Sequence, residues 1–208
     1  LNQLANGAHL NAIEAEALAA SILDASTPPA VIAAVLAALR TKGETGEELL
    51  GITRALLRVA GRVDGVPAGA LDTCGTGGDG ACTFNISTAA AFVVAACGVP
   101  VMKHGNRSVT SRSGSADVIE ALGIPFTQPG EAAGNFAFLF APQFHTALKH
   151  IGPVRKAMGI RTVFNLVGPL ANPAHPDFQL VGVSARERLP DVARALQGLG
   201  RKRAFVVH

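Results

Sequence analysis

A glycine-rich segment near the middle of the chain limits the possible folds more than any other feature. Residues 75–88 read GTGGDGACTFNIST, with glycine at 75, 77, 78 and 80. Glycine adopts backbone conformations that other residues avoid, and it lets main-chain N–H groups approach a ligand closely. The short run Ala70-Leu71-Asp72 leads into this segment, and a helix-forming stretch from Asn85 to Cys97 follows it. The sequence therefore predicts a strand, an anion-binding loop and a helix N-terminus, in that order.

Two nucleotide-binding patterns partly match this loop, and both fail. The pattern G-x-G-x-x-G fits Gly75, Gly77 and Gly80, but it requires an acidic residue about 20 positions later. No Asp or Glu occurs between Asp79 and Asp117. A P-loop requires Lys-Ser/Thr after its last glycine, where this chain has Ala-Cys. The loop is therefore expected to bind an anion in another way; the alternative is a simple tight turn.

A basic segment follows the next apolar run. Residues 99–102 read VPVM and predict a short buried strand, after which come Lys103, His104, Arg107 and Arg112. Ligands of α/β proteins bind at the carboxyl ends of the strands, so this segment is expected to meet the glycine loop. A helix dipole contributes only about 0.3–1 kcal/mol toward an anion, and a charge-assisted hydrogen bond about 1.5–3 kcal/mol. We expect Lys103 and the loop amides together to bind a pyrophosphate group, although any single basic residue such as Arg112, taken alone, fits a solvated loop better.

Residues 1–60 have a helical pattern. Asn11 with Glu14 and Thr45 with Glu48 fit capping boxes, and Thr27-Pro28 fits a helix start. Gly43 and Gly61 are placed to end helices, and apolar residues recur at helical spacing, namely Ile32, Leu36, Leu39, Ile52, Leu56 and Val59. Such short helices need another surface on which to bury their apolar faces.

After a linker at 62–69, strand and helix patterns alternate. Further strands are predicted at 136–141 (FAFLFA) and 204–207 (AFVV), with a helix that Ser113 or Ser115 caps and Gly123 ends. Alternation of this kind predicts an α/β fold. We expect a small N-terminal helical domain at 1–64, joined by about 150–172. A larger α/β domain with a central, mostly parallel sheet would cover 65–149 and 173–208.

Composition excludes several classes of protein. The chain is 49% hydrophobic, which favours a folded protein. Its net charge of +3 is modest and gives no strong indication of nucleic-acid binding. No apolar run is long enough to span a membrane and no export leader is recognisable. The three cysteines, Cys74, Cys82 and Cys97, lack disulfide-framework or zinc spacing, so we expect thiols in a reducing cytoplasm.

Longer motifs resemble the anthranilate phosphoribosyltransferase family. They are DTCGTGGDGACTFNISTAAA (72–91), KHGNRSVTSRSGSADVIEALG (103–123), FLFAPQFH (138–145) and VRKAMGIRTVFNLVGPLANP (154–173). The resemblance implies a cytoplasmic enzyme of tryptophan biosynthesis that dimerises through its helical domain. It would transfer phosphoribose from phosphoribosyl pyrophosphate to the amine of anthranilate, releasing pyrophosphate with the help of Mg²⁺. It implies no nucleic-acid or membrane partner.

The resemblance also implies the site residues. Those for phosphoribosyl pyrophosphate are Gly75, Gly78, Asp79, Thr83, Asn85, Ile86, Ser87, Thr88, Lys103, His104, Gly105, Asn106, Arg107, Ser108, Val109, Thr110, Ser111 and Ser115. Those for anthranilate are Gly75, His104, Asn106, His145, Arg155, Gly168 and Pro169, and Ser87 would contact Mg²⁺. No catalytic base is assigned, because an aromatic amine already has a free lone pair. Positioning and charge stabilisation would carry the reaction.

The chain departs from the family pattern in three places. His145-Thr146-Ala147 stands where the family usually has His-Pro-Ala, and the segment near 129–136 is short by about two helical turns. The family also continues beyond this point into a loop whose Asp-Glu pair binds magnesium, so we expect a fragment or an incomplete form of an active enzyme. Two alternatives stay open: a pyrimidine nucleoside phosphorylase, and a non-catalytic paralogue that binds nucleic acid.

Overall fold

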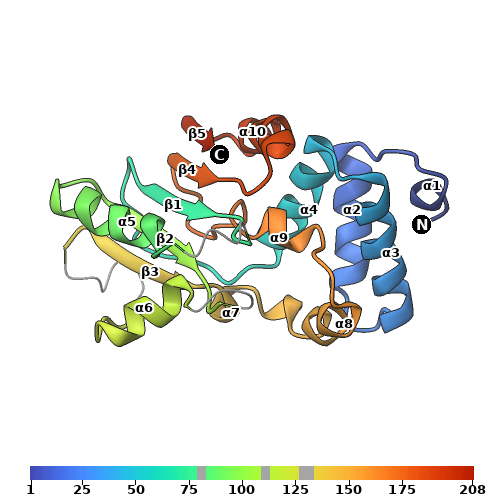
Figure 1. Cartoon of the computed structure of the whole chain (residues 1–208), viewed down its shortest axis with the longest axis horizontal. Coiled ribbons are helices and arrows are strands. Elements are labelled where there is room, and N and C mark those ends of the chain that lie inside the picture. The colour runs from blue at the N-terminus through green and yellow to red at the C-terminus, as the bar shows by residue number, and fades with distance from the viewer. Residues whose placement is uncertain (79–82, 109–112, 127–133) are drawn as a thin grey trace. The chain divides into compact units, whose positions relative to one another are not determined.

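The chain divides into two units, one helical and one α/β. The computed structural model describes residues 1–78, 83–108, 113–126 and 134–208. The helical unit comprises Leu1–Ala60, His145–Ala171 and Pro190–Gly200, and the α/β unit comprises Gly61–Phe144, Asn172–Leu189 and Arg201–His208 (Figure 1). The segment 190–200 groups with the helical unit, although the sequence placed all of 173–208 with the α/β part. None of the helices in the described ranges is long and apolar enough to cross a membrane.

The helical unit is built on two capping boxes that the sequence predicted. Asn11 Oδ1 accepts from Glu14 N at 2.9 Å and Glu14 Oε2 accepts from Asn11 N at 2.9 Å, and Thr45 and Glu48 make the same reciprocal pair. Both predictions are confirmed. The helices of this unit are α1 (Asn2–Ala5), α2 (Ala12–Leu23), α3 (Pro29–Lys42), α4 (Gly46–Arg58), η2 (Thr146–Leu148), α8 (Ile151–Met158), α9 (Phe164–Val167) and most of α10 (Leu189–Gly198).

Two predicted helix boundaries are wrong. Helix α3 begins at Pro29 rather than one residue earlier, because the Thr27 hydroxyl donates to Ser21 O at 2.6 Å instead of capping α3. Helix α4 ends at Arg58, before Gly61, and Val59 is therefore 49% exposed rather than buried. Gly43 does end α3, with a positive φ of 85°.

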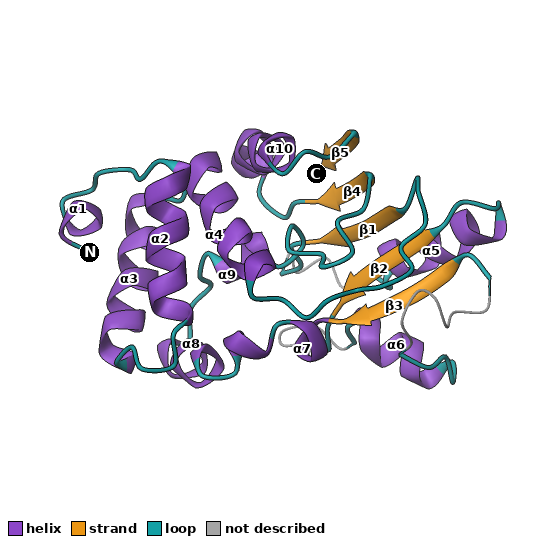
Figure 2. Ribbon diagram, turned by 180° about the vertical axis from the view of Figure 1, so that it is seen from behind, coloured by secondary structure: helices purple, strands orange, loops and turns teal. Residues whose placement is uncertain are grey.

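The α/β unit is a five-stranded parallel sheet in the order β3-β2-β1-β4-β5 (Figure 2). The strands are β1 (Leu71–Gly75), β2 (Val101–Gly105), β3 (Phe136–Phe140), β4 (Phe178–Gly182) and β5 (Arg203–Val207). The helices are α5 (Ile86–Ala96), α6 (Ser115–Ala121), α7 (Ala141–Phe144) and η3 (Arg186–Arg188). Strands β3 and β5 confirm predictions, whereas β4 and α10 were not predicted.

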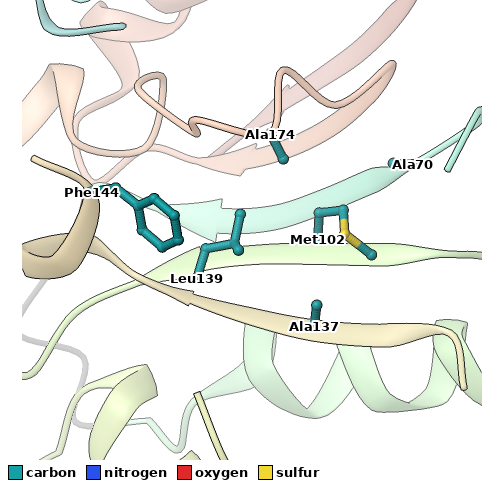
Figure 3. Close-up of a cluster of buried hydrophobic side chains, with 6 residues drawn as sticks. All are labelled: Ala70, Met102, Ala137, Leu139, Phe144 and Ala174. Carbon is teal, nitrogen blue, oxygen red and sulfur yellow. The ribbon is translucent and has the colours of Figure 1, made fainter. Parts of the chain in front are cut away.

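Each face of the sheet carries its own apolar cluster, because side chains alternate along a strand. On one face Phe138 packs with Ala116 and Ile119 of α6 and with Phe92 of α5. The other face carries Ala70, Met102, Ala137, Leu139, Phe144 and Ala174, drawn as sticks in Figure 3. The two clusters pack the sheet from both sides.

Two boundaries in this unit also differ from the expectation. Strand β2 continues to Gly105, so Lys103 and His104 are buried strand residues rather than loop residues. Helix α6 begins at Ser115 after an N-cap at Gly114, so neither Ser113 nor Ser115 caps it. The carboxylate of Asp117 instead accepts from Gly114 N at 2.7 Å.

Candidate functional site

The glycine loop begins where β1 ends. Gly77 and Gly78 have φ values of 61° and 71°, a region that side chains other than glycine rarely adopt. Thr76 N donates to Gly182 O at 2.9 Å and so fixes the point at which the loop leaves the sheet. Asp79, the next residue predicted for the site, lies outside the described residues.

The loop leads into the first turn of helix α5. This turn has no acidic side chain. Asn85 is the N-cap residue of α5, but its side chain makes no capping hydrogen bond to the helix. Asn85 Nδ2 instead donates to Ser113 Oγ at 3.0 Å. Thr83 and Ile86 are exposed, whereas Thr88 is buried and its hydroxyl has no partner among the described residues. An uncapped helix start with small hydroxyl side chains is suited to an anion.

Lys103 lies beneath this helix start and is only 1% exposed. Its Nζ donates to Thr73 O at 2.5 Å and to Ser87 Oγ at 3.3 Å, while Thr73 Oγ1 donates to Ser87 O at 2.7 Å. Hydrogen bonds thus join Thr73 of β1, Lys103 of β2 and Ser87 of α5. Burial lowers the pKa of Lys103, and the charge of Asp72 opposes that shift. Lys103 therefore places a positive charge directly below the first turn of α5.

Asp72 provides a buried negative charge in the same strands. It is fully buried, and its carboxylate accepts from His104 N and from Gln179 Nε2, each at 3.4 Å. Burial raises the pKa of Asp72, and the charge of Lys103 counteracts that rise. Gln179 in turn accepts from Arg201 Nε at 3.0 Å. This arrangement gives the sheet beneath the site both signs of charge.

The segment after β2 is held to helix α6. Arg107 donates to both carboxylate oxygens of Glu120, at 2.7 and 2.9 Å, and to Asp117 at 3.1 Å. Its guanidinium also lies 5.9 Å from the centre of the Phe140 ring. Asn106 O accepts from Ala116 N at 3.2 Å and from the Ser115 hydroxyl at 3.4 Å. Three further residues predicted for this segment, Val109, Thr110 and Ser111, lie outside the described residues, as does Arg112.

The remaining predicted residues belong to the helical unit. Arg155 Nη2 donates to Asn165 Oδ1 at 3.2 Å, and its guanidinium lies 5.6 Å from the centre of the Phe164 ring. Its Nε is buried and has no partner among the described residues, and burial lowers its pKa. His145 Nε2 donates to Ala171 O at 2.8 Å, and burial lowers the pKa of His145. Gly168 ends α9, and the buried Pro169 follows it.

The described residues do not form a magnesium site by themselves. No group of three or more His, Cys, Asp or Glu residues able to hold a metal ion occurs within 1–78, 83–108, 113–126 and 134–208. Ser87 offers one neutral oxygen, and that oxygen accepts from a lysine. Mg²⁺ prefers carboxylate and phosphate oxygens. The cation would therefore need ligands beyond these residues.

Sequence reasoning missed two residues of this region, Thr73 and Asp117. Both lie within the quoted motifs, and neither was assigned a role. The role of Asp117 could have been predicted from its position, since an acidic residue at the third position of a helix often accepts a hydrogen bond from the N-cap amide. The role of Thr73 could not, because its contacts join segments far apart in the chain.

Comparison with known proteins identifies the family. Residues 1–60 match the helical bundle domain of a glycosyl transferase family, and residues 68–208 match the a/b domain of that family. The chain therefore belongs to this glycosyl transferase family.

Two of its similar relatives carry the same name. The chain is 52% identical over 216 residues to anthranilate phosphoribosyltransferase from Solibacter usitatus, and 51% identical over 213 residues to that of Brevibacillus brevis. All of the chain is covered in each alignment, but only 64% and 62% of the relatives. The chain thus spans less than two thirds of the length of these relatives.

Solved structures agree with this result. The crystal structure of anthranilate phosphoribosyltransferase from Thermus thermophilus has a TM-score of 0.87 and 41% identity, covering 96% of this chain and 62% of that one. The Saccharomyces cerevisiae enzyme, in complex with PRPP and Mg, has a TM-score of 0.85 and 33% identity, covering 95% and 61%.

Proposed function

We propose that the chain is part of an anthranilate phosphoribosyltransferase. The enzyme would transfer 5-phosphoribose from phosphoribosyl pyrophosphate to the amine of anthranilate, with release of pyrophosphate, in tryptophan biosynthesis. The observation that carries the proposal is the first turn of α5: it has no acidic side chain, follows a glycine loop, and lies above the ammonium group of Lys103. The names of the relatives support the same reaction.

The donor would be held by its phosphates. Departure of pyrophosphate leaves cationic character on the ribose and adds negative charge to the leaving group. Main-chain N–H groups at the start of α5 can donate to phosphate oxygens. Lys103 adds positive charge from below and fixes Ser87 through a hydrogen bond of 3.3 Å. These groups stabilise the charge that develops on the pyrophosphate. The amine attacks through its lone pair and afterwards loses its proton to water, so no proton-transfer residue is assigned.

The acceptor would be oriented through its carboxylate by Arg155. A guanidinium group and a carboxylate match as a two-pronged pair. The buried Nε of Arg155 has no partner among the described residues, and Phe164 supports the guanidinium plane. An anionic ligand would offset the cost of burying this cation.

We expect Arg155→Lys to raise the KM for anthranilate about tenfold or more, because lysine cannot form the planar two-pronged pair. The KM for phosphoribosyl pyrophosphate should change less than about threefold. Steady-state kinetics on the full-length protein measure both values. Lys156→Gln, at an exposed position on the same helix, is the matched control. Equal changes in both KM values would show that Arg155 does not bind the acceptor.

The reaction itself is tested by anthranilate fluorescence. When the full-length protein is mixed with phosphoribosyl pyrophosphate and Mg²⁺, the fluorescence of anthranilate should decrease as anthranilate is consumed. Omitting phosphoribosyl pyrophosphate or Mg²⁺ should prevent this decrease. Turnover of a pyrimidine nucleoside with phosphate, without consumption of anthranilate, would overturn the proposal in favour of a nucleoside phosphorylase.

Assembly and location follow from the same resemblance. We propose a cytoplasmic homodimer formed through the helical unit, in which Ile13 and Val31 are apolar residues exposed by 78% and 40%. Light scattering on the full-length protein should give twice the subunit mass, and a monomer at micromolar concentration would contradict this assembly.

A further inference from the structure

The carboxylate of Asp117 joins two segments that are separate in the sequence. Its Oδ2 accepts from Ser108 N at 3.2 Å and from Gly114 N at 2.7 Å. Its Oδ1 accepts from Arg107 Nη1 at 3.1 Å. One side chain on α6 therefore holds both the segment that leaves β2 and the residue that starts the helix.

Helix capping explains only one of these contacts. Asp117 is the third residue of α6, and an acidic residue there commonly accepts from the N-cap amide, here Gly114. The amide of Ser108 belongs to no helix, so the capping pattern does not account for it. The second contact therefore points to a role in placing the segment 106–108.

Packing at Gly114 shows how closely the two segments are joined. A Cβ atom at this position would lie 2.6 Å from Arg107 C and 2.6 Å from Asn106 O. Both are backbone atoms, which cannot move aside as the end of a side chain can. Any residue larger than glycine at 114 would therefore displace residues 106–108.

We propose that Asp117 is a positioning residue for donor binding, since its carboxylate fixes the backbone of residues 106–108 at the carboxyl edge of the sheet. The proposal rests on the proposed function, because the donor is phosphoribosyl pyrophosphate. The amides of Gly114 and Ser108, and then Arg107, hold the pKa of Asp117 below its ordinary value. The side chain is therefore a carboxylate at neutral pH and accepts both amide hydrogen bonds.

Glu120 provides a matched control on the same helix. It pairs with the same Arg107, at 2.7 and 2.9 Å, and each of these bonds joins two side chains. Glu120→Gln removes a charge next to Arg107 and leaves in place the two hydrogen bonds that the backbone amides of Ser108 and Gly114 donate to Asp117. Asp117→Asn keeps the size of the side chain but replaces the charged acceptor of the two amides.

Amide hydrogen exchange on the full-length protein tests the positioning without any substrate. In Asp117→Asn, peptides that contain Ser108 and Gly114 should exchange about tenfold faster or more, whereas in Glu120→Gln they should exchange as in wild type. Unchanged exchange in Asp117→Asn, or equal acceleration in both variants, would overturn the proposal.

Kinetics test the consequence for the donor. Asp117→Asn should raise the KM for phosphoribosyl pyrophosphate about tenfold or more, with kcat and the KM for anthranilate within about threefold of wild type. Glu120→Gln should leave all three within about threefold. Gly114→Ala should reproduce the donor defect with the carboxylate intact, which covers the case that Asp117→Asn fails to fold.

The outcomes separate this proposal from the proposed function. Wild-type activity with an unchanged donor KM in Asp117→Asn and Gly114→Ala would overturn the role of Asp117 alone. A wild-type protein that does not consume phosphoribosyl pyrophosphate would overturn the proposed function, and with it the role in donor binding.

Discussion

Replacing Lys103 with methionine should reduce kcat/KM for phosphoribosyl pyrophosphate by about 100-fold or more. Methionine has a similar length and fits the buried space, but it removes the charge below α5 and both hydrogen bonds, to Thr73 O and Ser87 Oγ. The KM for anthranilate should change much less. Steady-state kinetics on the full-length protein measure both effects, and equal weakening of both substrates would show that Lys103 does not serve the donor.

The same substitution should lower the free energy of unfolding by about 3 kcal/mol, because the buried Asp72 would lose one of the two cations, Lys103 and Arg201, that offset its burial. The double variant Lys103→Met/Asp72→Asn should recover much of that stability and none of the activity. Lys202→Met is the control, since Lys202 is a surface lysine that pairs with Asp177 at 3.0 Å. If Lys103→Met unfolds at the same urea concentration as Lys202→Met, the buried charges do not stabilise each other.

Gly51→Ala should have the largest effect on the stability of the helical unit. A Cβ at this position of α4 would lie 2.7 Å from Glu16 N and 2.8 Å from Ala15 Cβ, so that α2 would have to move away. Overpacking of this kind costs about 1–3 kcal/mol, and the contact with backbone places Gly51 near the upper end. The free energy of unfolding in urea measures the loss.

Gly152 in α8 is the matched control, because a Cβ there would meet no atom within 4 Å. Gly152→Ala should stabilise the protein by about 0.5–1 kcal/mol, since alanine loses less backbone entropy than glycine in a helix. A loss below about 0.5 kcal/mol in Gly51→Ala would show that α2 and α4 do not pack as closely as described.

Much of the fold could be predicted from local patterns. The capping boxes at Asn11 and Thr45, the stop at Gly43 and strand β3 all depend on residues close in the sequence, and all are confirmed. The predicted start of α3 failed because a second local contact competed with capping: the Thr27 hydroxyl donates to Ser21 O, six residues earlier in the preceding helix.

The candidate site shows the same division. The sequence by itself determined the glycine loop, the acid-free window up to Asp117 and the family, because these depend on which residues follow one another. Only the tertiary structure decided that Lys103 lies inside the sheet, held by Thr73 and Ser87, and that Asp117 joins Ser108 to Gly114. The physical reason is that a buried lysine and a shared carboxylate acquire their partners from other segments, and pairing of that kind is set by packing across strands and helices.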